Sequence, residues 1–159
     1  MIFNGLRSTS KKSLGGEYLD STDAAIIEHF GHFESATKES MLVDIQSMID
    51  AGKKGKIVIV KAWPGFSFLD PDFMKLPLSQ KKEIAASNLL FPLAAFLAGA
   101  QEYSYLIYTW GYNIYDGSLE WYPEFDRPLG KPLGDATVSG WEMTRYFEHA
   151  KVWVNLETK

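Results

Sequence analysis

The sequence predicts an α/β fold built around a parallel β-sheet. Segments that resemble strands and helices alternate along the chain, as expected of βαβ units. The strand-like segments are nearly continuous apolar runs, which are typical of parallel strands buried on both faces. A length of 159 residues suits one domain, so we treat residues 1–159 as a single domain.

Four strands are predicted before residue 113. They lie in MIFNGL (1–6), AAIIEHF (24–30), KIVIVKAWP (56–64) and YSYLIYTWGY (103–112). The first run ends at Asn4-Gly5, a pair that favours a turn. The fourth is rich in β-branched and aromatic residues, which favour strands.

A helix is predicted over residues 34–55, between the second and third strands. Its apolar residues recur at helical spacing, and they are Met41, Leu42, Ile45, Met48 and Ile49. Ser35 or Thr37 can cap the start of this helix, and Gly52 can end it.

A longer helical segment is predicted over residues 78–101, before the fourth strand. Ser79 is a plausible cap for its first turn. Pro92 should kink the helix or mark its junction with a second helix, because proline lacks the backbone N–H that a helix interior needs.

The C-terminal part begins with a long loop, from about Asn113 to Ser139. The closing segment WEMTRYFEHAKVWVNLE (141–157) is expected to form two strands around His149-Ala150. The alternative is a helix through WEMTRYFEHA followed by one strand. Alternation of Val152, Val154 and Leu156 favours the last strand in either case.

Composition excludes several classes of protein. The net charge is −4 and no basic block occurs, so we expect no nucleic-acid partner. The apolar run LLFPLAAFLAGA is too short to cross a bilayer and contains Pro92, so we expect no membrane partner. The absence of cysteine excludes disulfides, thiolate nucleophiles and thiolate metal sites.

The first residues lack the pattern of a signal peptide and read directly as a strand. Natural chains rarely begin inside a core strand, so we expect this sequence to be internal to a larger protein. The sequence does not decide the compartment. A signal peptide on a full-length protein would make it extracellular or periplasmic.

The residues best placed for chemistry follow the predicted strands, because functional groups of parallel α/β folds gather at the C-terminal ends of strands. They are Asn4, Glu28, His29, Trp63, Tyr108, Trp110 and Tyr112. Aromatic rings stack on pyranose faces, while carboxylates and amides bind hydroxyls. A Glu with a raised pKa can then protonate a glycosidic oxygen. This set of side chains therefore predicts a sugar site.

The long loop contributes further candidates for binding a sugar. They are Asp116, Glu120 and Trp121, accompanied by Tyr122, Glu124 and Asp126. A connection of this length argues for function. The alternative is a solvated loop anchored by its aromatic residues.

Each candidate also has a purely structural interpretation. Glu28 can be a hydrogen-bonded carboxylate at a strand end, and Asn4 before Gly5 can simply form a turn. Trp63 can cover the end of the sheet. The Tyr-x-Trp-x-Tyr run at 108–112 cannot point inward throughout, so part of it should face a cleft or a loop.

Other chemistries have less support. His29 and His32 lie beside Glu28 and Glu34, but their spacing does not match a zincin helix, so no metal site is predicted. Neither a P-loop nor a G-x-G-x-x-G follows the first strand, and we expect no cofactor. A G-x-S-x-G nucleophile elbow is also missing.

The chain resembles the C-terminal part of glycoside hydrolases with a TIM-barrel fold, the hypothetical glycosyl hydrolase families related to the α-galactosidase and endo-polygalactosaminidase barrels. The segments that carry the resemblance are IFNGL, AAIIEHFG, KIVIVKAWP, YLIYTWGY, RPLGKPLGDA and RYFEHAKVWVNLE. Each is short, but together they span nearly the whole chain. The resemblance implies that the four strands are barrel strands five to eight, so the chain would be the C-terminal half of a (β/α)8 barrel.

By this resemblance, Glu28 ends the sixth barrel strand and acts as general acid/base. Its partner carboxylate would lie in the half of the barrel that this chain does not contain. The expected function is hydrolysis of O-glycosidic bonds in an oligo- or polysaccharide. The expected substrate-binding residues are Asn4, His29, Trp63, Tyr108, Trp110, Asp116, Glu120 and Trp121. A complete barrel needs about 250 residues, so the chain should pair with itself or with a missing N-terminal half.

Two other functions stay open at this point. A non-catalytic carbohydrate-binding or assembly module would use the aromatic residues and not Glu28. A stand-alone doubly wound domain of unrelated function would be a monomer without exposed sheet edges, whereas a half-barrel would dimerise or be unstable.

Overall fold

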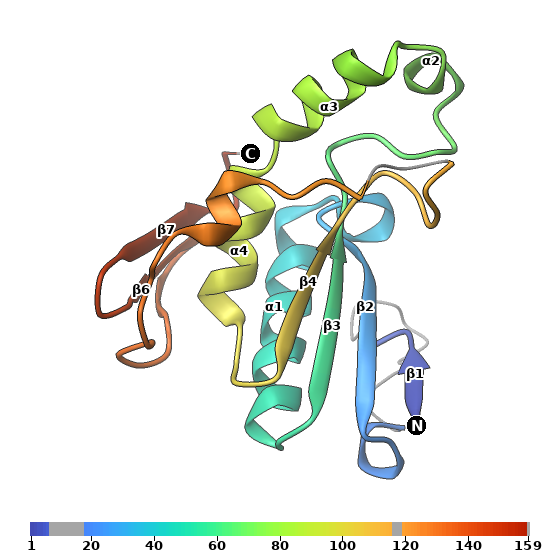
Figure 1. The fold of residues 1–159 in the computed structure, drawn as a ribbon. Helices are drawn as coiled ribbons and strands as arrows, with labels where there is room; N and C mark the ends of the chain where they lie inside the picture. The colour runs from blue at the N-terminus through green and yellow to red at the C-terminus, as the bar shows by residue number, and fades with distance from the viewer. Residues whose placement is uncertain (7–17, 116–118, 159) are drawn as a thin grey trace.

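The computed structural model describes residues 1–6, 18–115 and 119–158, and this part contains two β-sheets with helices between them (Figure 1). The first sheet is parallel and consists of β1 (Ile2–Asn4), β2 (Ala24–Phe30), β3 (Ile57–Ala62) and β4 (Ser104–Tyr108). The second is antiparallel and consists of β5 (Thr137–Ser139), β6 (Glu142–Tyr146) and β7 (Lys151–Asn155). The predicted α/β class with four parallel strands is confirmed.

The strands of the parallel sheet lie side by side in chain order, β1-β2-β3-β4. This register divides the side chains between two faces, because successive residues of a strand point to opposite sides. Val58, Val60 and Ala62 of β3 are fully buried on one face. Ile59 and Lys61 alternate with them and point to the other face.

Helices cover the face of the sheet that carries Val58 and Val60. α1 (Lys38–Lys53) and α4 (Leu90–Gly99) lie on this side of the parallel sheet (Figure 1). In the described part of the chain, no helix covers the opposite face. A doubly wound domain has helices on both faces of its sheet, whereas the described residues place helices on one face.

The helix boundaries confirm one predicted cap and correct two other expectations. Thr37 is the N-cap of α1, where its hydroxyl accepts from the Ser40 N–H, and the helix continues one residue beyond Gly52. Ser79 is not a cap, because its helix already begins at Leu78 after Pro77. Pro77 presets the extended entry to that helix, which leaves Ser79 inside the first turn.

The predicted long helix is two helices, in agreement with the junction expected near Pro92. α3 (Leu78–Ser87) ends before α4, and Pro92 lies in the first turn of α4. Proline is tolerated there because the first N–H groups of a helix have no intrahelical acceptor. A short helix, α2 (Pro71–Met74), precedes α3.

The C-terminal segment forms two strands, β6 and β7, which pair through five residues around the turn at His149-Ala150. The helical alternative for WEMTRYFEHA is therefore wrong. The preceding loop also contains more structure than expected, since it includes a 3₁₀ turn at Pro123–Asp126 and the strand β5.

One hydrophobic cluster joins the two sheets. Met143 and Val154 of the antiparallel sheet belong to the same buried cluster as the apolar residues of α1 and β3. Arg145 of β6 reaches into this region, where its Nη1 donates to the Leu97 carbonyl (2.9 Å) and its Nε donates to the Gly134 carbonyl (2.9 Å). A buried guanidinium of this kind is tolerated because carbonyl oxygens accept from it.

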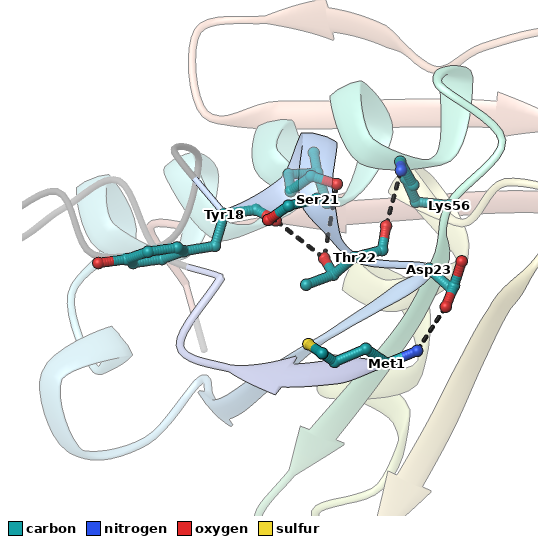
Figure 2. A network of polar contacts seen from close by, with 7 residues as sticks. Met1, Tyr18, Ser21, Thr22, Asp23 and Lys56 are labelled. Atoms are coloured by element: carbon teal, nitrogen blue, oxygen red, sulfur yellow. Dashed lines mark hydrogen bonds and ion pairs between the residues drawn. The ribbon is translucent and has the colours of Figure 1, made fainter.

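A polar network secures the N-terminal ends of β2 and β3 (Figure 2). The Met1 amino group pairs with the Asp23 carboxylate, and Lys56 Nζ donates to the Thr22 carbonyl (2.7 Å). Ser21 and Thr22 hydroxyls both donate to the Tyr18 carbonyl. These contacts support the register of the sheet at the end opposite to its C-terminal edge.

The uncovered face of the parallel sheet is apolar at the beginning of its strands and polar at their ends. Its exposed apolar side chains are Ile2, Ile57, Tyr105 and Ile107. Asn4, Glu28 and Lys61 follow on the same face near the C-terminal edge. Among the described residues, no helix is long and apolar enough to cross a membrane.

Candidate site at the C-terminal edge of the parallel sheet

A cavity of about 450 Å³ opens on the uncovered face of the sheet at the C-terminal ends of its strands. Its base is apolar, formed by Ile26, Ile59 and Ile107. Its polar wall consists of Asn4, Glu28, Lys61, Thr109, Tyr112 and Asn113. An apolar base with a few convergent polar groups is the usual character of a small-molecule site.

Glu28 lies at the centre of this polar wall. Its Oε1 accepts from the Tyr112 hydroxyl and its Oε2 accepts from Asn4 Nδ2, both at 2.6 Å. The pairing of β2 with β3 shifts register between Ile27 and Phe30, so the irregularity includes Glu28. Irregular pairing of this kind commonly reorients a side chain next to a functional site.

The hydrogen bonds to Glu28 determine its protonation. The Tyr112 hydroxyl, and after it the Asn4 amide, lower the pKa of Glu28 below the usual value, while partial burial opposes this effect. The expectation of a Glu with a raised pKa is therefore wrong for this structure. Glu28 is ionised at neutral pH.

Trp63 supports Glu28 through its indole. Its Nε1 donates to the Glu28 carbonyl (2.9 Å), and its ring contacts that of Tyr112, with 5.7 Å between centroids. Trp63 is only 4% exposed, so little of its ring is free to stack on a sugar. Its position therefore suits alignment of the site more than contact with a ligand.

Lys61 is a member of the site that sequence reasoning missed. It is 5% exposed, its Nζ lies 2.9 Å from the centroid of the Trp63 ring, and it donates to the Thr109 carbonyl (3.4 Å). Burial lowers the pKa of Lys61 to about 7, against the attraction of Glu28. The signal in the sequence was a lysine within the apolar run IVIVKAW, because lysine is rarely buried without a role.

Tyr108 and Trp110 lie in the hydrophobic core and do not line the cavity. The Tyr108 hydroxyl donates to the Ala85 carbonyl (2.7 Å), and the Trp110 ring stacks on Phe66. Tyr112 is 53% exposed and faces the cavity, as expected of one member of the Tyr-x-Trp-x-Tyr run.

The remaining candidates do not line the cavity either. His29 pairs with Glu34 (Nδ1 to Oε2, 2.6 Å), and Glu120 pairs with Lys82 of α3 (2.5 Å). Trp121 is 70% exposed, and its Nε1 donates to Asp126. Asp116 lies outside the described residues.

The arrangement can bind a polyhydroxylated molecule and act on it with one carboxylate. The Glu28 carboxylate accepts hydrogen bonds, the Asn4 amide and Tyr112 hydroxyl can also interact with hydroxyls, and Lys61 supplies a donor. Among the described residues that line the cavity, Glu28 is the one carboxylate. No group of three or more metal-ligating side chains occurs in the described ranges.

Comparison with known proteins gives a family for the chain. None of the curated proteins compared with it is significantly similar in sequence. The model of hypothetical glycosyl hydrolase family 15 matches residues 1–151, which is nearly the whole chain and includes every residue of the cavity wall. The chain therefore belongs to hypothetical glycosyl hydrolase family 15.

Proposed function

We propose that the chain takes part in the hydrolysis of O-glycosidic bonds in an oligo- or polysaccharide, with Glu28 as a catalytic carboxylate. The observation that carries this proposal is the pair of 2.6 Å hydrogen bonds that orient Glu28 toward the cavity. Family membership supports a carbohydrate-related function. Asn4 and Tyr112 adjoin Glu28 and are the groups nearest to a bound sugar.

The protonation of Glu28 selects its role. A general acid must hold a proton at working pH, whereas hydrogen bonds from Tyr112 and Asn4 lower the pKa of Glu28. Glycosidases pair a protonated carboxyl group with an ionised one. Glu28 fits the ionised member, which acts as general base on water or as nucleophile.

The protonated member must come from outside the described cavity wall. Four parallel strands in chain order, with α1 and α4 on one face only, have the layering of half a (β/α)8 barrel. We propose that a second set of four strands completes the barrel and supplies the other carboxyl group. Those strands come from an N-terminal half or from a second copy of this chain.

Replacement of Glu28 tests the catalytic role. We expect Glu28→Gln to abolish turnover, by a factor of about 10³ or more, and to preserve sugar binding, because the amide keeps the shape but has no charge. Turnover can be followed as release of reducing ends from a panel of polysaccharides and of nitrophenol from aryl glycosides. Binding can be followed by the chemical shift of the Trp63 indole on titration with the same sugars.

The matched control is Glu34→Gln. Glu34 is an exposed carboxylate that pairs with His29 and does not line the cavity. This variant should retain full turnover. Undiminished turnover in Glu28→Gln would overturn the catalytic assignment, and sugar binding without turnover in the unmodified chain would favour a binding module.

A further inference from the structure

Lys61 lines the cavity, but the function proposed above assigns it no part in the action of Glu28. We propose that Lys61 is a positioning residue, whose ammonium group orients the rings of Trp63 and Tyr112 and, through these rings, Glu28. The contacts stand independently of catalysis, and only the effect on turnover rests on the proposed function.

The contacts form a chain from Lys61 to Glu28. Lys61 Nζ lies 2.9 Å from the centroid of the Trp63 ring and 4.5 Å from that of Tyr112. Trp63 Nε1 donates to the Glu28 carbonyl, and the Tyr112 hydroxyl donates to Glu28 Oε1. One cation thus contacts both aromatic residues that bind Glu28, at its main chain and at its side chain.

A lysine at this position has a clear energetic cost. Lys61 is 5% exposed, and the hydrogen bond from its Nζ to the Thr109 carbonyl is long, at 3.4 Å. An apolar side chain would fill the same space without desolvating a charge. What the ammonium adds is attraction to the faces of the two rings and to the Glu28 carboxylate.

The positioning contact depends on pH. Burial lowers the pKa of Lys61 to about 7, whereas Glu28 raises it. Other titratable side chains adjoin these contacts: His29 lies next to Glu28 on β2, His32 stacks on the Trp63 ring with 5.7 Å between centroids, and Tyr112 follows β4. β1 contributes the neutral Asn4. The ammonium is present below about pH 7 and is lost above it, and the cation–π contacts are lost with it.

Nuclear magnetic resonance of the whole chain tests this proposal without any substrate. In the unmodified protein, we expect the Trp63 indole N–H resonance to shift with a midpoint near pH 7. In Lys61→Met this titration should be lost and the carboxyl pKa of Glu28 should rise, because the cation lowers that pKa. Lys61→Arg should retain the ring contacts from pH 5 to 9 and show no midpoint near 7.

Lys38→Met is a matched control, because Lys38 lies over the Trp141 ring at 4.7 Å, away from the cavity. It should leave the Trp63 titration and the pKa of Glu28 unchanged. Persistence of the titration in Lys61→Met, or an unchanged pKa of Glu28, would overturn the proposal. If Lys61→Met does not fold, Lys61→Arg tests the proposal. A Trp63 indole titration whose midpoint stays near pH 7 in Lys61→Arg would contradict the positioning role of Lys61.

The activity readout separates this proposal from the proposed function. If the chain hydrolyses a glycoside, kcat/KM should fall above pH 7. In Lys61→Arg this fall should occur at a higher pH. If Glu28→Gln leaves turnover intact, the catalytic assignment fails while the resonance experiment still measures the contacts of Lys61. An indole resonance without a midpoint near pH 7 in the unmodified chain would overturn the positioning role alone.

Discussion

Glu28 receives hydrogen bonds from two side chains that are far apart in the sequence. Asn4 ends β1, and Tyr112 follows β4, so the outer strands of the sheet both contribute to the environment of one carboxylate on β2. A carboxylate that accepts two such bonds is stabilised in its charged form. The site is therefore adapted to keep a negative charge at this position.

Removal of the phenol should make Glu28 easier to protonate. The Tyr112 hydroxyl is the main cause of the lowered pKa, so we expect Tyr112→Phe to raise the pKa of Glu28 toward its usual value. The carbon-13 chemical shift of the Glu28 carboxyl group, followed against pH, measures this pKa directly. Tyr105→Phe is the control, because Tyr105 is exposed on the same face of the sheet at the end away from Glu28.

The same substitution predicts a pH-dependent change in stability. A carboxyl group whose pKa is lower in the folded state stabilises that state above its unfolded pKa, and this contribution is lost as pH falls through the folded pKa. Tyr112→Phe should therefore reduce the free energy of unfolding more at pH 7 than at pH 3. An equal loss at both values would show that the phenol stabilises by packing alone.

At the scale of elements, the helix layer depends on a close approach of α1 and α4. Gly99 ends α4 against α1, where an added Cβ would lie 2.6 Å from Met48 Cε and 2.7 Å from Ile45 Cγ2. Both contacts are far shorter than ordinary van der Waals distances. The two helices can pack at this distance because Gly99 has no side chain.

Gly99→Ala should therefore destabilise the fold, by about 1–3 kcal/mol, because the two fully buried neighbours must move or the helices must separate. Urea denaturation followed by circular dichroism measures the change. Ala86→Ser, on the exposed surface of α3, should alter the free energy of unfolding by less than about 0.5 kcal/mol. A neutral Gly99→Ala would mean that the α1–α4 contact adjusts without cost.

At the scale of the whole molecule, one face of the parallel sheet is covered and the other is open. The open face exposes Ile2, Ile57, Tyr105 and Ile107, and among the described residues the outer edges of β1 and β4 have no strand partner. Contiguous exposed apolar residues and unpaired strand edges both favour association. The open face corresponds to the interior of the barrel that we propose.

We expect the isolated chain to self-associate through this face. Sedimentation at increasing concentration should reveal species larger than the 17.9 kDa monomer. Ile107→Lys should shift the distribution toward monomer, because it places a charge on the open face. Leu78→Lys is the control, since Leu78 is exposed on α3. A chain that stays monomeric throughout would contradict the half-barrel architecture and favour a stand-alone domain.

Much of the fold could be predicted from local patterns in the sequence. Apolar runs identified the four parallel strands, helical periodicity identified α1, and the alternation in KVWVN identified β7. Helix starts were less predictable, as Ser79 shows, because a hydroxyl caps a helix only where the backbone of its own residue is non-helical. The site was predicted in part: Asn4, Glu28 and Trp63 do lie together at one edge.

The sequence by itself determined the α/β class and the carboxylate at the end of β2, because strand and helix periods are local properties of the chain. Only the tertiary structure decided that Tyr108 and Trp110 face the core while Lys61 and Tyr112 face the cavity. It also decided the protonation of Glu28, because a pKa depends on groups that folding brings within hydrogen-bonding distance from β1 and from the segment after β4.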